Sequence, residues 1–425
     1  MSKVIVLGLD IGTSGVRCVA VDGDGDTVAR ASGRFADHRA DPRDALVWAS
    51  LADQALRDVL ARVDCAAVRA IAIDGTSGTM LAVDAEGAPV ACPLMYDAPI
   101  ADAELIDRIA ANAPADSAAH GATSGLAKAL LLQEAPGAAH LLHQADWIAG
   151  RLSGRWDISD ENNALKTGYD SIARRWGAWI ERTGVRPALL PRVVPAGTQV
   201  APITRAAADR FGLSPSVQVV AGTTDGCASF LATGAGAFGD GVTALGSSLT
   251  IKILSDRPIF SPEHGIYSHR IAGGWLAGGA SNTGGKVLSA FFDDRRLTAL
   301  SARIDPARPA RHDYYPLLAP GERFPVADPD MPPRLLPRPA DDVDFLHELL
   351  AGIATIEAQG YAQLAALGGP TLRSVRSVGG GARNARWTAL RERLLDVPFL
   401  PVRSHEAAAG AARLALESIR EGALA

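Results

Sequence analysis

Residues 4–22 have the sequence Val4-Ile-Val-Leu-Gly-Leu-Asp10-Ile-Gly12-Thr13-Ser14-Gly15-Val-Arg17-Cys-Val-Ala-Val21-Asp22. A run of apolar, largely β-branched residues meets a tight turn of Gly, Thr and Ser, and a second run of strand-forming residues follows. Such a turn exposes backbone N–H groups and small hydroxyls, which suit phosphate oxygens. The stretch therefore predicts a phosphate-binding β-hairpin, with contacts from Gly12, Thr13 and Ser14 and added positive charge from Arg17.

The same pattern returns just past the middle of the chain. Val219-Val-Ala-Gly222-Thr223-Thr224-Asp225-Gly226 precedes a second hairpin, Gly239-Asp-Gly241-Val-Thr-Ala-Leu245-Gly246-Ser247-Ser248-Leu249-Thr-Ile-Lys252. Gly246, Ser247 and Ser248 form its turn, and two such turns that face one another could hold a polyphosphate. Taken alone, each turn is equally typical of an ordinary hairpin with Asx-turn or Ser-rich turn chemistry.

Length and composition favour a two-domain globular protein. A chain of 425 residues is too long for one ordinary core, and the repeated hairpin predicts a boundary just before Gln218, giving domains 1–217 and 218–425. The hydrophobic share of 48% and the charged share of 21% are typical of globular proteins. A net charge of −5 gives no reason to expect nucleic acid or a membrane surface as a partner.

Cysteine usage indicates a reducing compartment. Cys18, Cys65, Cys92 and Cys227 are scattered, without a C-x-x-C pair or nearby His partners, which argues against a zinc site and a disulfide framework. No leader pattern and no apolar stretch of membrane-spanning length is visible. We therefore expect a cytoplasmic protein.

The order of the elements alternates hairpins with helices. Strands are expected at 4–9, 16–21, 27–31, 68–73, 80–83, 218–220, 242–245, 249–254 and 374–378. Helices are expected at 49–63, 225–235 and 341–367 and from Arg383, because apolar residues recur there at helical spacing. This is an α/β pattern, but not the simple βαβ repeat of a doubly wound fold.

Two aspartates are the candidates for chemistry. Asp10, at the end of a strand beside a glycine turn, is suited to hold Mg²⁺, which needs only one or two carboxylates because it keeps several waters. Asp225 follows a strand and starts a helix, so its carboxylate lies near a helix N-terminus and stays ionised. It is the candidate catalytic base and a second metal ligand; the alternative is a plain helix N-cap.

The order of the motifs resembles the FGGY carbohydrate kinases of the actin/hexokinase/Hsp70 ATPase superfamily, over nearly the whole chain. The motifs that carry it are Asp10-Ile-Gly-Thr-Ser-Gly-Val-Arg17, Gly222-Thr-Thr-Asp225-Gly226, Leu245-Gly-Ser-Ser-Leu249 and Gly379-Gly380-Gly381-Ala-Arg-Asn384. Ala72-Ile-Asp-Gly-Thr-Ser-Gly78, Ser124-Gly-Leu-Ala-Lys128 and Asp313-Tyr-Tyr-Pro316 are among the stretches that resemble the short D-ribulose kinase branch of cyanobacteria and plants.

This resemblance implies two ribonuclease-H-like α/β domains with the active site in the cleft between them. ATP with Mg²⁺ would bind mostly to the C-terminal domain, contacting Gly246, Ser247, Ser248, Gly284, Gly380, Gly381 and Asn384. Glycines let the backbone approach a flat base, and Asn384 could bond the adenine or ribose. The sugar would bind mostly to the N-terminal domain, near Asp10, Ser77, Gly78, Asp97, Lys128 and Asp225.

Some of these sugar contacts have open alternatives. Asp97 stands in Tyr96-Asp97-Ala98, where the family has an Asn-Asp pair, so it is either a sugar ligand or a solvated loop residue. Lys128 either bonds a sugar hydroxyl or ties the lobe together, and Lys166 is either a substrate contact or a structural ion-pair partner.

The predicted reaction is ATP + D-ribulose → ADP + D-ribulose 5-phosphate, with Asp225 as base. The acceptor could instead be D-xylulose, L-ribulose or a polyol such as ribitol. A non-catalytic nucleotide-binding protein is the alternative from a different class. The sequence leaves a monomer and a homodimer open.

Overall fold

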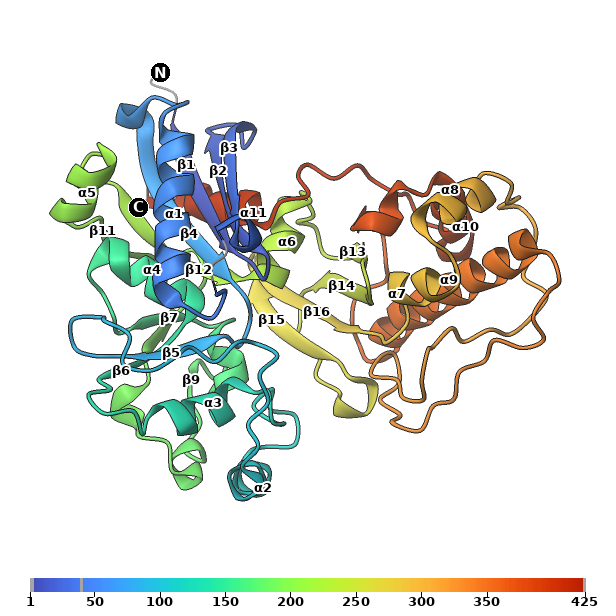
Figure 1. The fold of residues 1–425 in the computed structure, drawn as a ribbon, viewed down its shortest axis with the longest axis horizontal. Coiled ribbons are helices and arrows are strands. Elements are labelled where there is room, and N and C mark those ends of the chain that lie inside the picture. The colour runs from blue at the N-terminus through green and yellow to red at the C-terminus, as the bar shows by residue number, and fades with distance from the viewer. Residues whose placement is uncertain (1–3, 39–40, 423–425) are drawn as a thin grey trace. The chain divides into compact units, whose positions relative to one another are not determined.

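The protein is described here by a computed structural model covering residues 4–38 and 41–422. The chain forms two compact units, one of residues 1–232 with 406–425 and one of residues 233–405. Each is built on a mixed β-sheet with helices against it (Figure 1).

The sheet of the first unit has the strand order β11-β12-β4-β1-β2-β3. The opening hairpin forms as predicted, because β1 pairs antiparallel with β2, and the turn lies between Ile11 and Val16. Strand β4 then pairs parallel with β1, and β12 pairs parallel with β4. The bounds are β1 (Ile5–Ile11), β2 (Gly15–Asp22), β3 (Thr27–Arg34), β4 (Val68–Gly75), β11 (Gln199–Pro202) and β12 (Gln218–Thr224).

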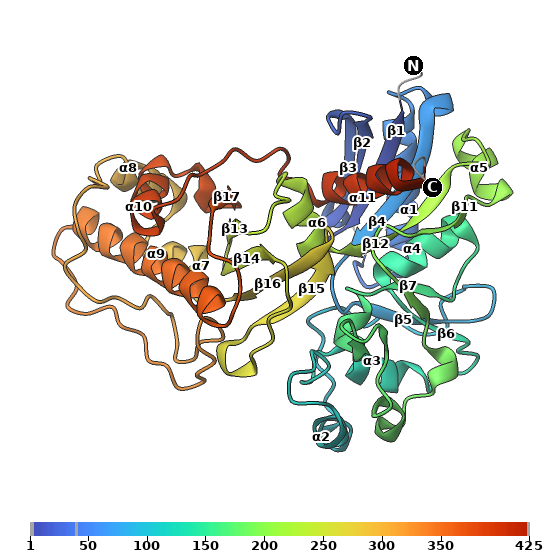
Figure 2. The same cartoon turned by 180° about the vertical axis from the view of Figure 1, so that it is seen from behind.

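Helices cover both faces of this sheet. Leu7 and Leu9 of β1 share one buried cluster with Trp48 and Leu56 of α1 (Ala45–Leu60). The other face of β1 carries Gly8 and packs against α11 (Ala407–Gly422), whose alanines are buried. Figures 1 and 2 show α1 and α11 on opposite sides of the strands.

A long excursion between β4 and β12 forms a second layer of the first unit. It holds a smaller core around Met80, Leu126, Leu130 and Ile180, and its β5 and β6 pair antiparallel. Its strands are β5 (Met80–Val83), β6 (His140–His143), β7 (Ile158–Asp160), β8 (Tyr169–Asp170), β9 (Arg175–Trp176) and β10 (Arg192–Val194). Its helices are α2 (Ala103–Asn112), α3 (Gly125–Leu132) and α4 (Gln144–Ser153), and α5 (Arg205–Phe211) and α6 (Asp225–Ala232) follow.

The sheet of the second unit has the order β15-β16-β14-β13-β17. It repeats the arrangement of the first, since β13 and β14 form an antiparallel hairpin and β17 pairs parallel with β13. The strands are β13 (Asp240–Leu245), β14 (Leu249–Ser255), β15 (Tyr267–Ile271), β16 (Gly274–Ala280) and β17 (Ser374–Val378).

The second unit packs its sheet against one long helix. That helix, α9 (Asp342–Ala366), buries Phe345, Leu349 and Ile353 in a cluster with Ile251 and Ile253 of β14. The remaining helices are α7 (Gly285–Phe291), α8 (Asp294–Ser301) and α10 (Ala385–Leu395). In both views α8 and α10 lie beside α9 (Figures 1 and 2).

The structure divides the chain differently from the predicted boundary at 217/218. Residues 218–224 form β12, which lies between β11 and β4 in the first sheet, so they do not start a new domain. The chain also returns at its end, where α11 packs on β1 and Arg413 donates a hydrogen bond to the carbonyl of Leu231 at 2.6 Å. Across 4–38 and 41–422, no helix combines the length and apolar character needed to cross a membrane.

The contact between β1 and α11 gives a test of the fold. A Cβ atom on Gly8 would overlap the Ala408 carbonyl oxygen and lie 2.5 Å from the Ala412 amide nitrogen. We expect Gly8→Ala to lower the free energy of unfolding by about 1–3 kcal/mol, since strand and helix must separate. Urea denaturation measures this. The control is Gly23→Ala, whose Cβ would meet only Val4 Cβ at 3.9 Å; equal stability of the two variants would contradict this packing.

Candidate functional site

Three strands of the first unit end at the same level and bring carboxylates together. In the parallel register Asp10 of β1 lies opposite Asp74 of β4, and Asp74 lies opposite Thr223 of β12. Asp225 follows β12 directly and begins α6. The negative charges of Asp10 and Asp225 both act on Asp74, so the three side chains form one electrostatic cluster.

The first hairpin turn adjoins this cluster. The Gly12 amide donates to the Gly15 carbonyl at 3.0 Å, which closes the turn and leaves Thr13 and Ser14 exposed. Arg17 Nη1 donates to Asp10 Oδ2 at 3.0 Å, and Arg17 Nη2 lies 3.4 Å from Ser14 Oγ. The predicted phosphate contacts therefore lie together at the end of β1.

Burial makes this carboxylate cluster unfavourable in its fully ionised form. Burial raises the pKa of Asp10, an effect that Arg17 opposes and the charge of Asp225 reinforces. Burial also raises the pKa of Asp74 well above its usual range, and Asp10 and Asp225 add to the rise. Both carboxylate oxygens of Asp74 are buried and have no hydrogen-bond donor beside them, and the carboxylate of Asp10 lies close to them. A cation or a proton here would relieve the repulsion.

The residues fit a magnesium ion that is shared with phosphate. No set of three His, Cys, Asp or Glu side chains in the part of the chain that the structure describes could hold a metal by itself. Magnesium needs only one or two carboxylates when phosphate oxygens and water complete its shell. Asp10 and Asp225 supply such a pair, and Asp74 keeps the surroundings rich in oxygen.

The predicted sugar segment forms a rigid turn after β4. Thr76 Oγ1 lies 2.6 Å from Thr79 Oγ1 and donates to Gln144 Oε1 at 2.8 Å. Gly78 has φ = 89°, a conformation that favours glycine. Ser77 Oγ is buried and has no hydrogen-bond partner in the structure, so it is available to a ligand hydroxyl.

Lys128 serves the structure rather than the predicted sugar contact. Its side chain is buried, and its ammonium donates to the carbonyl oxygens of Gly78 at 2.8 Å, Tyr96 at 2.9 Å and Thr123 at 3.0 Å. These three bonds use all of its N–H donors, so none remains for a sugar hydroxyl. Burial, followed by the charge of Lys166, lowers its pKa to about 8. Lys128 thus ties three loops of the site together.

Asp97 and Tyr96 lie at the exposed edge of the same site. Asp97 is exposed, and its charge favours the ammonium form of Lys128. The pKa of Tyr96 is raised by burial first, and then by the charges of Asp97 and Asp225. The charges of Asp97 and Asp225 therefore both act on the Tyr96 side chain.

The second unit carries a separate pocket of about 950 Å³. Five of the predicted nucleotide contacts line it: Gly246, Ser247, Gly380, Gly381 and Asn384. Gly379, with φ = 85°, turns the chain from β17 into a 3-10 turn, and a Cβ there would approach the Leu245 carbonyl oxygen to 2.7 Å. The volume and the glycine-lined wall suit a flat, polar ligand such as a nucleotide.

Three residues of the predicted nucleotide set have other positions or duties. Gly284 and Ser248 do not line the pocket; a Cβ on Gly284 would lie 2.7 Å from Ser248 Cα, so they pack the turn against α7. Asn384 lines the pocket but caps α10, because its Oδ1 accepts from the Trp387 amide at 3.1 Å. Its Nδ2 donates to Ser301 Oγ at 2.9 Å, which leaves one N–H for a ligand.

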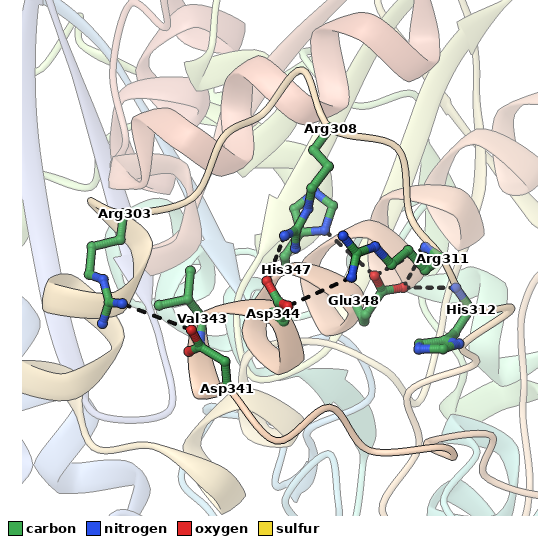
Figure 3. Close-up of polar contacts among 9 residues, drawn as sticks. All are labelled: Arg303, Arg308, Arg311, His312, Asp341, Val343, Asp344, His347 and Glu348. Carbon is green, nitrogen blue, oxygen red and sulfur yellow. Dashed lines mark hydrogen bonds and ion pairs between the residues drawn. The ribbon is translucent and has the colours of Figure 1, made fainter.

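A polar cluster joins the loop that follows α8 to the first turns of α9 (Figure 3). The buried Glu348 accepts hydrogen bonds from the backbone amides of Arg311 and His312 at 3.0 Å each. Arg308 pairs with Asp344 at 2.5 Å. These bonds fix the loop that follows α8, and α8 supplies Asp294, Thr298 and Ser301 to the pocket.

The sequence did not single out Asp74 of the first unit or the α8 residues that line the pocket of the second unit. Asp74 was not singled out because an Asp within a buried strand gives no sign of which residue lies opposite it; the parallel register with Asp10 shows it. The α8 residues were missed because they carry no motif, and only tertiary packing brings them to the glycine turn.

Comparison with known proteins agrees with this architecture. Residues 241–418 match the FGGY family of carbohydrate kinases, C-terminal domain. An autoinducer-2 kinase from Enterobacter sp. (strain 638) is 28% identical over 291 residues, covering 62% of this chain and 53% of that protein. One from Yersinia enterocolitica is 29% identical over 286 residues, covering 61% of this chain and 52% of that protein. The chain thus spans about half the length of the curated relatives it matches.

Solved structures resemble the chain over nearly its full length. A xylulose kinase from Brucella ovis superposes with a TM-score of 0.85 at 23% identity, covering 98% of this chain and 91% of that one. A gluconate kinase from Lactobacillus acidophilus gives 0.84 at 16% identity, covering 99% and 90%. At these identities the likeness shows the fold, which is the predicted α/β fold of two domains.

The predicted resemblance to the FGGY carbohydrate kinases is therefore confirmed for the C-terminal part of the chain that matches the family model. Residues 241–418 are an FGGY carbohydrate kinase C-terminal domain. The predicted D-ribulose branch and the roles of individual site residues stay predictions.

The buried His143 behind the sugar segment predicts a specific pH dependence of stability. Burial, followed by the charges of Lys128 and Lys166, lowers its pKa to about 3. Below about pH 6.5 His143 is protonated in the unfolded chain but stays neutral in the folded chain. Protonation therefore favours the unfolded state, and the free energy of unfolding decreases as the pH falls from 6.5 toward 3. Between pH 6.5 and 5, the free energy of unfolding should decrease by about 2 kcal/mol more for the wild type than for His143→Gln.

Urea unfolding at several pH values measures this difference. Asp146 and Asp160 are present in both proteins, so their titration cancels to first order. Parallel stability curves for wild type and variant would contradict a neutral, buried His143.

Proposed function

We propose that the protein is an ATP-dependent sugar kinase that converts D-ribulose to D-ribulose 5-phosphate. The observation that carries the proposal is the position of Asp225, which begins α6 directly after β12 and acts electrostatically on both Asp10 and Asp74. A nucleotide-sized pocket in an FGGY C-terminal domain supports ATP as the phosphoryl donor.

In the proposed reaction Asp225 is the general base. A sugar hydroxyl is a very weak acid, and a carboxylate within hydrogen-bond reach accepts its proton late in the transfer. The Gly226 amide donates to Asp225 Oδ1 at 2.7 Å, and the carboxylate lies at the start of α6. The base is thereby held at a defined place at the end of the sheet.

The hairpin turn and Arg17 would receive the phosphoryl group. Thr13 and Ser14 are exposed beside the Gly12 amide, and Arg17 already bonds both Asp10 and Ser14. Its guanidinium offers five donors, so it can contact a phosphate oxygen while it keeps Asp10. Asp10 and Asp225 would hold Mg²⁺, which neutralises charge on the phosphates when bound.

The choice of D-ribulose rests on the turn after β4 and its resemblance to the ribulose branch. Ser77 offers an unpartnered hydroxyl, and Lys128 fixes the loops around it. D-Xylulose, L-ribulose, ribitol and the substrate of the autoinducer-2 kinases are the competing acceptors. The fold alone does not rank them, because one hydroxyl's configuration distinguishes several of them.

ATP consumption by the purified protein with Mg²⁺ tests the proposal. We expect turnover with D-ribulose to exceed turnover with D-xylulose, L-ribulose, ribitol and the no-sugar control. Preference for another acceptor would support phosphoryl transfer from ATP but contradict D-ribulose as the substrate. No acceptor-dependent turnover by a folded, ATP-binding protein would contradict the kinase.

Replacing the proposed base separates chemistry from binding. Asp225→Asn keeps the size of the side chain and removes its basicity, so kcat should fall by about 10²–10⁴-fold. ATP affinity, measured by calorimetry, should change little, because the nucleotide pocket lies in the other unit. Asp209→Asn, on the exposed α5, is the control. Asp225→Asn with near-wild-type kcat would rule out Asp225 as base.

A further inference from the structure

Lys166 is the one residue of its segment whose side chain reaches the surface. Residues 161–169 are buried except for Lys166, which is partly exposed. Within the described chain, its ammonium makes no hydrogen bond and no ion pair. This contrasts with Lys128 nearby, whose donors are all used.

The position of Lys166 is fixed by close packing. It lies on a 3-10 turn, Ala164–Thr167, that sits tightly against Gly125 at the start of α3. A Cβ on Gly125 would lie 3.2 Å from the Lys166 carbonyl oxygen and 2.5 Å from Thr167 Oγ1. The backbone of Lys166 therefore cannot shift without displacing α3.

The side chain extends along the sugar segment. A Cβ on Gly78 would lie 3.6 Å from Lys166 Cδ and 4.0 Å from Lys128 Nζ. The charge of Lys166 also reaches Lys128 and His143, and it lowers the pKa of both. Lys166 thus brings an unpaired ammonium to the turn that holds Ser77 and Gly78.

The donors and acceptors of the site differ in what they can recognise. Asp97 and Asp225 offer carboxylate oxygens, which accept hydrogen bonds from sugar hydroxyls. The Ser77 hydroxyl can donate or accept, whereas an ammonium only donates. The guanidinium of Arg17 lies beside Asp10, and it is engaged with Asp10 and Ser14. A group that only donates is matched by an oxygen that only accepts, which in an open-chain ketose is the carbonyl.

We propose that Lys166 recognises the carbonyl oxygen of the substrate and so selects ketoses over the corresponding polyols. This inference rests on the proposed function, since it assigns a specificity to the same sugar site. A polyol carries a hydroxyl where the ketose has its carbonyl, and that hydroxyl can also donate to an acceptor such as a carboxylate. The carbonyl depends on a donor, so loss of Lys166 harms the ketose more.

Calorimetric binding without nucleotide tests the proposal independently of turnover. D-Ribulose and ribitol are titrated into the wild type, Lys166→Met, Lys166→Arg and a control, Lys252→Met, which removes a partly exposed lysine of the other unit. We expect Lys166→Met to weaken D-ribulose binding about 10- to 100-fold and ribitol binding much less. Lys166→Arg keeps donors and should retain part of the preference, and the control should match wild type.

Several results would overturn the inference. In Lys166→Met these are an equal decrease in affinity for D-ribulose and ribitol, or no decrease for either ligand. In the wild type these are equal affinities for the two ligands, or no binding of either. Thermal unfolding verifies that Lys166→Met is folded; if it is not, Lys166→Gln takes its place with the same expectation. D-Ribulose binding that depends on Lys166 in a protein without kinase turnover would sustain this inference and overturn the proposed function.

Discussion

The constraint on which the first unit depends is the common level at which β1, β4 and β12 end. Parallel pairing aligns Asp10, Asp74 and Thr223, and the helix that follows β12 starts at Asp225. Burial of several carboxylates at one place is costly unless protons, cations or donors compensate it. Arg17 compensates part of the charge of Asp10, and a magnesium ion shared with phosphate, if bound by Asp10 and Asp225 as proposed, would compensate more of it.

Each unit contains an antiparallel hairpin, but the residues that surround its turn differ between the two units. In the first unit the turn between β1 and β2 lies beside Asp10, which belongs to the cluster of interacting carboxylates. In the second unit the turn between β13 and β14 lies beside the glycines after β17, and together they form the wall of a pocket. The parallel partner strand thus brings different residues to the hairpin turn in the two units: β4 brings Asp74, and β17 leads into the glycines 379–381.

Much of this was predictable because local signals agree with the tertiary structure. The bounds of β5 and β17, and the helix starting at Asp225, follow from alternation, turns and apolar spacing. The sequence predicted a domain boundary before Gln218, but β12 completes the first sheet; a short buried strand does not reveal which sheet it joins. Likewise, the donors of Lys128 are used by three carbonyls whose convergence depends on loops distant in sequence. The roles of residues that depend on strand register or loop packing could not be predicted from the sequence. The turn motifs could be predicted, because their residues are contiguous in the chain.

The central claim is that the strand ends of the first unit direct phosphoryl transfer from ATP to a sugar hydroxyl. Phosphorus NMR of a reaction containing the protein, ATP, Mg²⁺ and D-ribulose tests it most directly, because it identifies the product rather than the loss of ATP. The account predicts a phosphomonoester on the terminal hydroxyl, identical to D-ribulose 5-phosphate. Inorganic phosphate as the only new phosphorus product, or no new product at all, would contradict it.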